Sequence, residues 1–243
     1  MILQPFSLAT VRTALGDGWQ LAAATRRTSV AYALIFTVGG ALIGGGLLAS
    51  GLTPLLIAAA GAFMLLGPVF LAGFYGIAAA HEAGAAGGAA AVLGGFRRAA
   101  PALWVLALVC ALLFMIFITD AAILYSYMIG GAPVWLAELP ADPRAVGRFL
   151  LWGGVSGLFI AFLLFAVSAF AVPLLCERRA GLVGAIVTSV RLVFANFWPA
   201  MLWALLLAAT IISSCLLLPL LPLTLPWLAY AGRALYRQAL PAD

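Results

Sequence analysis

The chain has 243 residues, of which 66% are hydrophobic and only 8% are charged, and its formal net charge is +5. Soluble domains carry roughly a quarter charged residues, so this composition, with a mean hydropathy of +1.21, excludes a soluble globular domain. All twelve basic residues are arginines, and they stand in small groups between apolar runs. They form no basic stripe, so we expect no nucleic acid as a partner.

The apolar runs predict an all-α fold, a polytopic bundle of transmembrane helices. The candidate spans cover residues about 29–51, 55–79, 101–126, 149–175, 199–215 and 217–235. Each of the first four reaches the roughly 20 apolar residues that cross a bilayer. The final run, 199–231, is too long for one crossing and short for two. Pro219, Pro222 and Pro226 interrupt it, which argues against one straight helix.

The arginines also predict an orientation, because positive residues concentrate in cytoplasmic loops. With a cytoplasmic N-terminus and the final run folded as a two-helix hairpin, ten arginines lie inside and two outside. A single final crossing gives eight inside and four outside. We therefore predict six spans with both termini cytoplasmic, and five spans are the alternative. Anionic headgroups of the cytoplasmic leaflet are the expected partners of these arginines.

Three segments have the spacing of amphipathic surface helices: 7–22, 85–98 and 181–196. In the first segment the predicted apolar face holds Leu8, Val11, Leu15 and Trp19. In the third it holds Leu182, Val183, Ile186, Val187, Val190 and Val193. All three segments are expected on the cytoplasmic surface. We treat residues 1–243 as one membrane domain, with a cytoplasmic amphipathic segment at 1–28, a first half at about 29–126 and a second half at about 149–237.

The two halves show a weak parallel repeat. His81-Glu82 ends one span, and a surface segment then leads to Pro101-Ala-Leu-Trp104. Cys176-Glu177-Arg178 ends another span, and a surface segment leads to Pro199-Ala-Met-Leu-Trp203. Each unit thus runs span, surface helix and proline-started span from the same side of the membrane. Chance similarity between apolar segments is the alternative explanation.

A few charged residues are candidates for a functional role. Glu82 and Glu177 occupy matching places in the repeat, and Arg178 and Arg179 follow Glu177 directly. These residues either form gating or partner-binding ion pairs, or they are helix ends that pair with arginine and lipid phosphate. Asp120 is the acid that lies well within an apolar run, about 28 Å along its helix from the start at a rise of 1.5 Å per residue. It is either a functional carboxylate or one that meets water at the outer interface.

Small residues and prolines give further signals. Two GxxxG motifs stand in the first and fourth spans, at Gly40 and Gly44 and at Gly153 and Gly157. Such motifs predict close helix packing, either within the chain or against a membrane-protein partner or a second copy. Pro68 and Pro173 are predicted to kink the second and fourth spans.

The sequence lacks motifs for catalysis or cofactor binding. It holds no nucleophile elbow, no HExxH, no P-loop and no GxGxxG followed by an acid. His81 is the single histidine, and the three cysteines have no paired spacing, so we expect no metal site and no haem. We predict no catalytic residue and no cofactor, and enzymatic activity is disfavoured.

Short stretches along most of the chain resemble one known family. They are Gly67-Pro68, Ala72-Gly73-Phe-Tyr75, Glu82-Ala-Gly84, Val172-Pro-Leu-Leu-Cys-Glu-Arg178, Ala185-Ile-Val-Thr-Ser-Val190, Asn196, Trp203, Leu225-Pro226 and Tyr236-Arg237. The family is the bacterial integral membrane proteins with domain of unknown function 2189. The resemblance implies a multi-pass protein of the bacterial inner membrane, and it brings no established biochemical role.

The leading functional hypothesis is a non-enzymatic accessory, scaffold or assembly component of a larger inner-membrane complex, such as a respiratory or photosynthetic one. It follows from the few ionisable groups in the spans, the missing catalytic motifs and the glycine-lined faces. A small-solute or lipid transporter or channel is the alternative, which the repeat and the prolines favour. That alternative requires a polar cavity near the middle of the membrane. A membrane enzyme is the third hypothesis.

Overall fold

The structure is a computed structural model that describes residues 4–49, 55–128 and 143–241. Its helices are α1 Leu8–Ala24, α2 Arg26–Ala49, α3 Leu55–Glu82, α4 Ala89–Arg98, α5 Ala102–Met128, α6 Pro143–Ser168, α7 Ala171–Cys176, α8 Leu182–Ala195, α9 Phe197–Leu216 and α10 Leu221–Ala239. A short 3-10 turn, η2 Leu218–Leu220, joins the last two helices. The fold is all-α, which confirms the predicted class.

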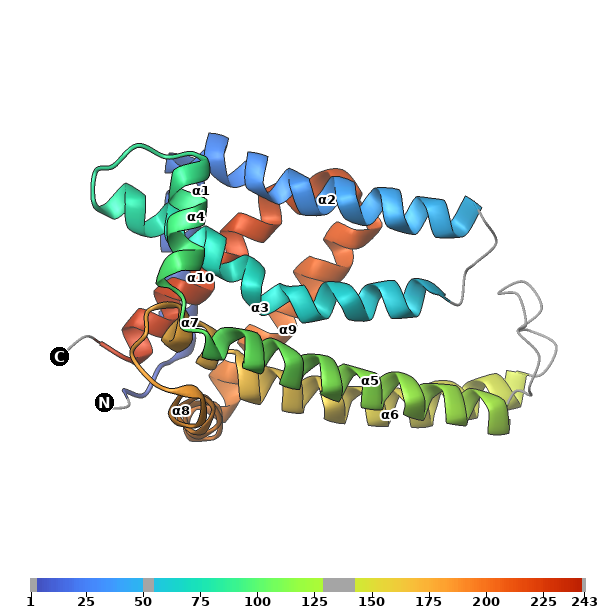
Figure 1. Cartoon of the computed structure of the whole chain (residues 1–243). Helices are drawn as coiled ribbons and strands as arrows, with labels where there is room; N and C mark the ends of the chain where they lie inside the picture. The colour runs from blue at the N-terminus through green and yellow to red at the C-terminus, as the bar shows by residue number, and fades with distance from the viewer. Residues whose placement is uncertain (1–3, 50–54, 129–142, 242–243) are drawn as a thin grey trace.

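The long helices extend from one end of the molecule, across which the short helices lie (Figure 1). We call this end the base and define it as α1, α4, α7, α8 and the C-terminal half of α10. The described ends of the chain meet at the base, where the Gln4 N–H donates to the Ala239 carbonyl, and the arginines of these helices and of the start of α2 also lie there. Arg144 and Arg148 lie at the opposite end, where α6 begins. The structure thus separates the arginines as the sequence predicts, while the side of the membrane that the base faces stays a prediction.

Several helices are long and apolar enough to cross a membrane. Within the described residues, four such stretches are Arg26–Gly46, Ala102–Met128, Val146–Cys176 and Phe197–Ser214. The 28-residue α3 runs back beside α2, and α9 and α10 form a hairpin that returns to the base (Figure 1). The two-helix geometry of the final run therefore agrees with the hairpin interpretation. The number of crossings and the parallel repeat stay predictions.

The buried core is concentrated near the base. In α5 the buried residues belong to the first third of the helix, from Leu103 to Cys110, whereas Leu112 and Ile123 farther along are 61% and 63% exposed. Likewise, Tyr32 and Ala33 of α2 are buried, and Leu42 is 71% exposed. The base is consequently a packed unit, and the far halves of the long helices present apolar side chains outward.

The fourth predicted span is broken between α6 and α7, and two features cause the break. Pro173 has no N–H to donate to the carbonyl of Ala169, and its ring crowds that carbonyl. The hydroxyl of Ser189 on α8 also inserts between two backbone groups of the predicted span. It donates to the Ala166 carbonyl at 2.7 Å and accepts from the Phe170 N–H at 3.1 Å. These two backbone groups would otherwise bond each other in a continuous helix. Pro68 lies at the middle of α3, which bends along its length in Figure 1.

The surface helices form at the predicted places, but their buried faces differ from the predicted ones. In α1, Val11, Ala14 and Gly18 are buried, whereas Leu8 and Trp19 are 57% and 60% exposed. A Cβ on Gly18 would lie only 2.5 Å from the Ala231 backbone nitrogen. The face of α1 is therefore selected by close approach to α10, which requires small residues.

In α8 the buried residues are Ala185, Ser189, Leu192 and Val193, whereas Val183 is 73% exposed. Val193 of the predicted apolar face is buried, but the buried face is turned toward Ala185 and Ser189 and away from Val183 and Val187. The polar Ser189 faces inward because the break between α6 and α7 needs its hydroxyl.

Candidate functional site: a charged cluster at the base

Four charged side chains from three places in the sequence meet at the base. Glu82 ends α3, Glu177 caps α7, and Arg233 and Arg237 lie one turn apart on α10. Arg233 donates to Glu82 through Nη1–Oε1 at 2.6 Å and Nη2–Oε2 at 3.1 Å. Arg237 donates to the same two oxygens at 2.8 and 3.3 Å, and to Glu177 Oε1 at 3.3 Å. We call these four residues the Glu–Arg cluster.

Arg233 is the buried centre of the Glu–Arg cluster. Its side chain is 5% exposed, compared with 45% for Arg237 and 43% for Glu82. Its guanidinium lies over the Tyr75 ring, 5.9 Å from the centroid, so the ring face adds a cation–π contact. Its Nε is 3.4 Å from Glu177 Oε1 without the geometry of a hydrogen bond. The charge of Arg233 is thus compensated mainly by Glu82.

The Glu–Arg cluster shifts the pKa of Glu82. Burial of the carboxyl raises its pKa, but the hydrogen bonds and charges of Arg233 and Arg237 outweigh burial and lower the pKa below the ordinary value of 4.5. Glu82 lies at the end of α3, beyond the apolar stretch. It is therefore charged throughout the neutral range, and the two arginines favour that state.

The lowered pKa of Glu82 predicts that the base becomes less stable in acid. A carboxyl whose folded pKa lies below its unfolded pKa contributes stability that is present above pH 4.5 and lost as pH falls through the folded value. We expect the melting temperature of the purified protein to fall in this acid range, and Glu82→Gln to flatten that part of the profile. Circular dichroism melts in detergent at a series of pH values measure this. A Glu82→Gln profile as steep as that of the wild type would contradict the assignment.

Arg178 and Arg179, which follow Glu177, bind backbone carbonyls and not the neighbouring carboxylate. Arg178 Nη2 donates to the carbonyls of Arg97 and Ala99 at 3.1 and 3.3 Å, at the end of α4. Arg178 also has a φ of 52°, and this left-handed conformation costs a non-glycine residue roughly 1–2 kcal/mol. The strained turn points its side chain toward α4.

Arg179 holds the C-terminal end of α10. It donates to the carbonyls of Leu240 and Pro241, each at 2.7 Å, and to the Tyr236 hydroxyl at 3.1 Å. These carbonyls follow a helix end, where a cation is favourable. The structure therefore gives Arg179 a capping contact, and its gating or partner role stays a prediction.

A pocket of about 330 Å³ lies beside the Glu–Arg cluster, between α3, α4, α7 and α10. The polar residues that line it are Tyr75, Glu82, Arg98, Cys176, Glu177, Arg178, Arg233 and Arg237. Glycine and alanine form much of the remaining wall, including Gly76 and Gly95. The structure thus brings Glu82, Glu177 and Arg178 of the predicted site residues to one cavity.

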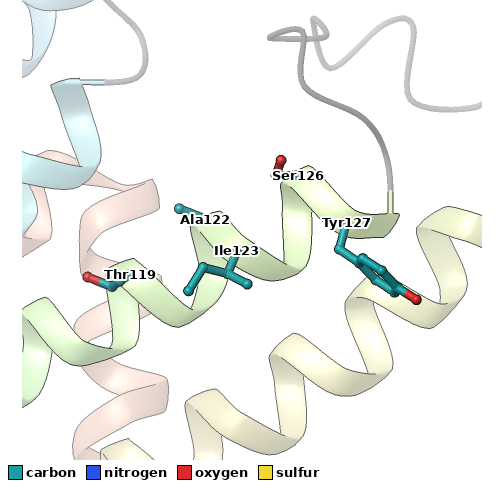
Figure 2. Close-up of a pocket in the computed structure, with 5 residues that line it drawn as sticks. All are labelled: Thr119, Ala122, Ile123, Ser126 and Tyr127. Atoms are coloured by element: carbon teal, nitrogen blue, oxygen red, sulfur yellow. The ribbon is translucent and has the colours of Figure 1, made fainter.

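Asp120 is not part of this site. It lies on α5, far along the helix from the base, and its Oδ2 is buried without a hydrogen-bond partner among the described residues. A shallow depression of about 520 Å³ lies beside the same stretch of α5, and Figure 2 shows the residues along it, from Thr119 to Tyr127. The described residues that line it all come from α5. The role of Asp120 stays a prediction.

Two glycines of the GxxxG motifs face open space within the described part of the chain. A Cβ built on Gly40 or Gly153 meets no described atom within 4 Å, and Gly44 is half-buried. Gly157 approaches another helix, where its Cβ would lie 3.1 Å from the Phe117 ring of α5.

The chain's own close helix contacts use other glycines. A Cβ on Gly76 of α3 would lie 2.6 Å from the Gly95 Cα of α4, and one on Gly95 would meet the Ala72 carbonyl oxygen. Sequence reasoning missed both of these glycines. Neither belongs to a GxxxG motif, and α4 lacks the apolar length by which a packing helix is recognised in a membrane protein.

Sequence reasoning also missed Arg233 and Arg237 as site residues. A signal was present, because arginines four residues apart lie at the end of the last apolar run, and ionisable residues there point to a partner.

No metal site is found in the part of the chain that the structure describes. Within residues 4–49, 55–128 and 143–241, no group of three histidine, cysteine or acidic side chains is placed to hold an ion.

The apolar helices with their packed base define a multi-pass helical membrane protein. The model of one family, described as "Predicted integral membrane protein (DUF2189)", matches residues 55–177, and the chain belongs to this family. The matched region begins with α3 and ends at Glu177, so it contains both glutamates of the Glu–Arg cluster but neither arginine. Neither a curated protein nor a solved structure matches the chain.

Proposed function

We propose that the protein is a non-enzymatic accessory or assembly component of a larger complex in the bacterial inner membrane. The observation that carries the proposal is the open space beside Gly40 and Gly153. Small residues in membrane helices let a second helix approach closely, because helix association in lipid depends on packing and not on hydrophobic burial. Among the described residues, no helix of the chain approaches these two positions.

Neighbouring glycines extend the same open surface. Gly39, Gly45 and Gly46 of α2 and Gly154 of α6 also have no atom of the described residues within 4 Å of a built Cβ. In contrast, Gly18 and Gly95 of the base lie so close to a neighbouring helix that a Cβ would collide with its backbone. This division supports a base that folds by itself and helices that receive a partner in the membrane.

A transporter is less well supported by the geometry. It requires a polar cavity near the middle of the membrane, and the charged pocket lies at the base, where α3 and α7 end. Its walls are joined by ion pairs between α3, α7 and α10. These features favour a fixed base, which suits an assembly component.

The proposal predicts that bulky residues at the open glycines release the partner without unfolding the chain. We expect the wild type to migrate in a complex on a native gel after mild detergent extraction, and Gly40→Leu with Gly153→Leu to migrate as a free chain. Gly16→Leu is the matched control, since Gly16 also has open space but lies on α1 at the base.

Circular dichroism melts of the three purified proteins accompany the gel, and we expect similar melting temperatures. A wild type that migrates homogeneously as a lone monomer would contradict the proposal. So would a glycine variant that stays in the complex. Mass spectrometry of the band identifies the companion protein.

A further inference from the structure

The pocket beside the Glu–Arg cluster has an excess of positive charge. Arg98, Arg178, Arg233 and Arg237 supply four positive charges to its wall, and Glu82 and Glu177 supply two negative ones, which leaves two positive charges unmatched. Its volume of about 330 Å³ is at the small end of the about 300–1,000 Å³ that is typical of ligand sites. The pocket therefore has both the room and the charge for a small anionic group.

The charges in the wall are divided between two pairs of arginines. Arg233 and Arg237 use their N–H groups in ion pairs with Glu82 and Glu177. Arg98, the last residue of α4, is exposed and makes no ion pair or hydrogen bond among the described residues. The unmatched charge is thus on the side of the pocket that α4 forms.

Arg178 completes this side of the pocket. Among the described residues, only its Nη2 forms hydrogen bonds, with the carbonyls of Arg97 and Ala99. Those contacts hold its guanidinium next to the end of α4 and leave the remaining N–H groups available. A planar guanidinium with two free N–H groups matches two oxygens of a phosphate.

We propose that this pocket binds a phosphate group that carries about two negative charges, as inorganic phosphate or as a phosphate monoester, with Arg98 and Arg178 as its ligands and the Glu–Arg cluster as the rigid wall behind them. A phosphate monoester carries about 1.5–2 negative charges near pH 7, which matches the excess of two. A carboxylate or a phosphodiester, with one charge, leaves one guanidinium unmatched. The inference does not depend on the proposed accessory function.

The phosphate has two sources that the pocket chemistry does not separate: the headgroup of a phosphatidic acid and inorganic phosphate in water. Calorimetric titration of the detergent-purified full chain with inorganic phosphate tests the second source. Native mass spectrometry with added dioleoyl phosphatidic acid tests the first, and dioleoyl phosphatidylcholine is the control lipid. We expect one saturable site per chain for at least one of the two phosphates.

Two variants of equal charge separate a pocket from general electrostatic attraction. Arg98→Gln removes a pocket residue that makes no hydrogen bond or ion pair among the described residues, so we expect the fold to be retained. We expect it to weaken binding about tenfold, as for the loss of one charge-assisted hydrogen bond. Arg191→Gln removes an exposed arginine of α8, which does not line the pocket, and we expect an affinity within about twofold of the wild type.

The outcomes are distinct. Saturable binding of phosphatidic acid alone, or of both phosphates, with selective loss in Arg98→Gln, supports the site and identifies its source. The same holds for inorganic phosphate alone. Equal loss in Arg98→Gln and Arg191→Gln, binding of phosphatidylcholine as tight as that of phosphatidic acid, or no saturable binding of either phosphate overturns the proposal.

Discussion

Replacing Gly95 by alanine is expected to destabilise the protein by about 1–3 kcal/mol, although alanine is the better helix former. The added methyl would meet the Ala72 carbonyl oxygen and lie 2.9 Å from the Gly76 Cα. Both obstacles are backbone atoms of α3, which cannot rotate away. The methyl therefore forces α4 off α3, and the melting temperature by circular dichroism in detergent falls.

Gly153→Ala is the matched control for Gly95→Ala. The same methyl enters open space at this position, so the melting temperature is expected to stay constant or to rise slightly, by up to about 1 kcal/mol of stability. Equal losses in the two variants would show that glycine itself, and not the contact between α3 and α4, sets the effect.

Replacing Arg233 by methionine is expected to cost about 3 kcal/mol. Removal of one partner from a buried ion pair costs about 3–5 kcal/mol because the other charge loses its compensation. The low end applies here, since Glu82 is 43% exposed and water reaches it. After the change Glu82 and Glu177 share Arg237 alone.

Arg237→Met is the comparison for this second prediction, because Arg237 contacts the same two glutamates. Its side chain is 45% exposed, so its loss is expected to cost within about 1 kcal/mol. Unfolding followed by circular dichroism in detergent measures both variants. Adding Glu82→Gln to Arg233→Met should recover part of the loss, since Arg237 then has to compensate only Glu177. Equal costs for the two arginines would contradict the central place of Arg233.

Much of this fold follows from short-range patterns in the sequence. The long apolar runs correspond to α2, α3, α5, α6, α9 and α10. The three amphipathic segments correspond to α1, α4 and α8. Their positions are readable because apolar length and helical periodicity are local properties. The separation of Arg144 and Arg148 from the other ten arginines is readable for the same reason.

The faces on which these helices pack were harder to predict. The buried side of α1 is chosen by Ala231, more than 200 residues away in sequence, and it favours Gly18 over the larger Trp19. The inward position of Ser189 depends on a break in another helix. Such choices depend on partners that no window of sequence contains.

The candidate site was predicted in part. Glu82 and Glu177 hold matching places in the predicted repeat, and both form ion pairs with the same two arginines. Their true partners, Arg233 and Arg237, lie in the last helix, whereas adjacency pointed to Arg178 and Arg179. Those two neighbours turn to backbone carbonyls because helix ends leave carbonyls without partners.

If the long helices receive a partner in the membrane while the base folds by itself, the partner should leave the membrane together with the chain. Native mass spectrometry of the complex, released from its membrane with bound lipid, measures this. We expect a mass that exceeds the 25.2 kDa chain by a second protein, and the loss of that protein in the Gly40→Leu, Gly153→Leu variant. A chain of 25.2 kDa that carries only lipid in the wild type would contradict it.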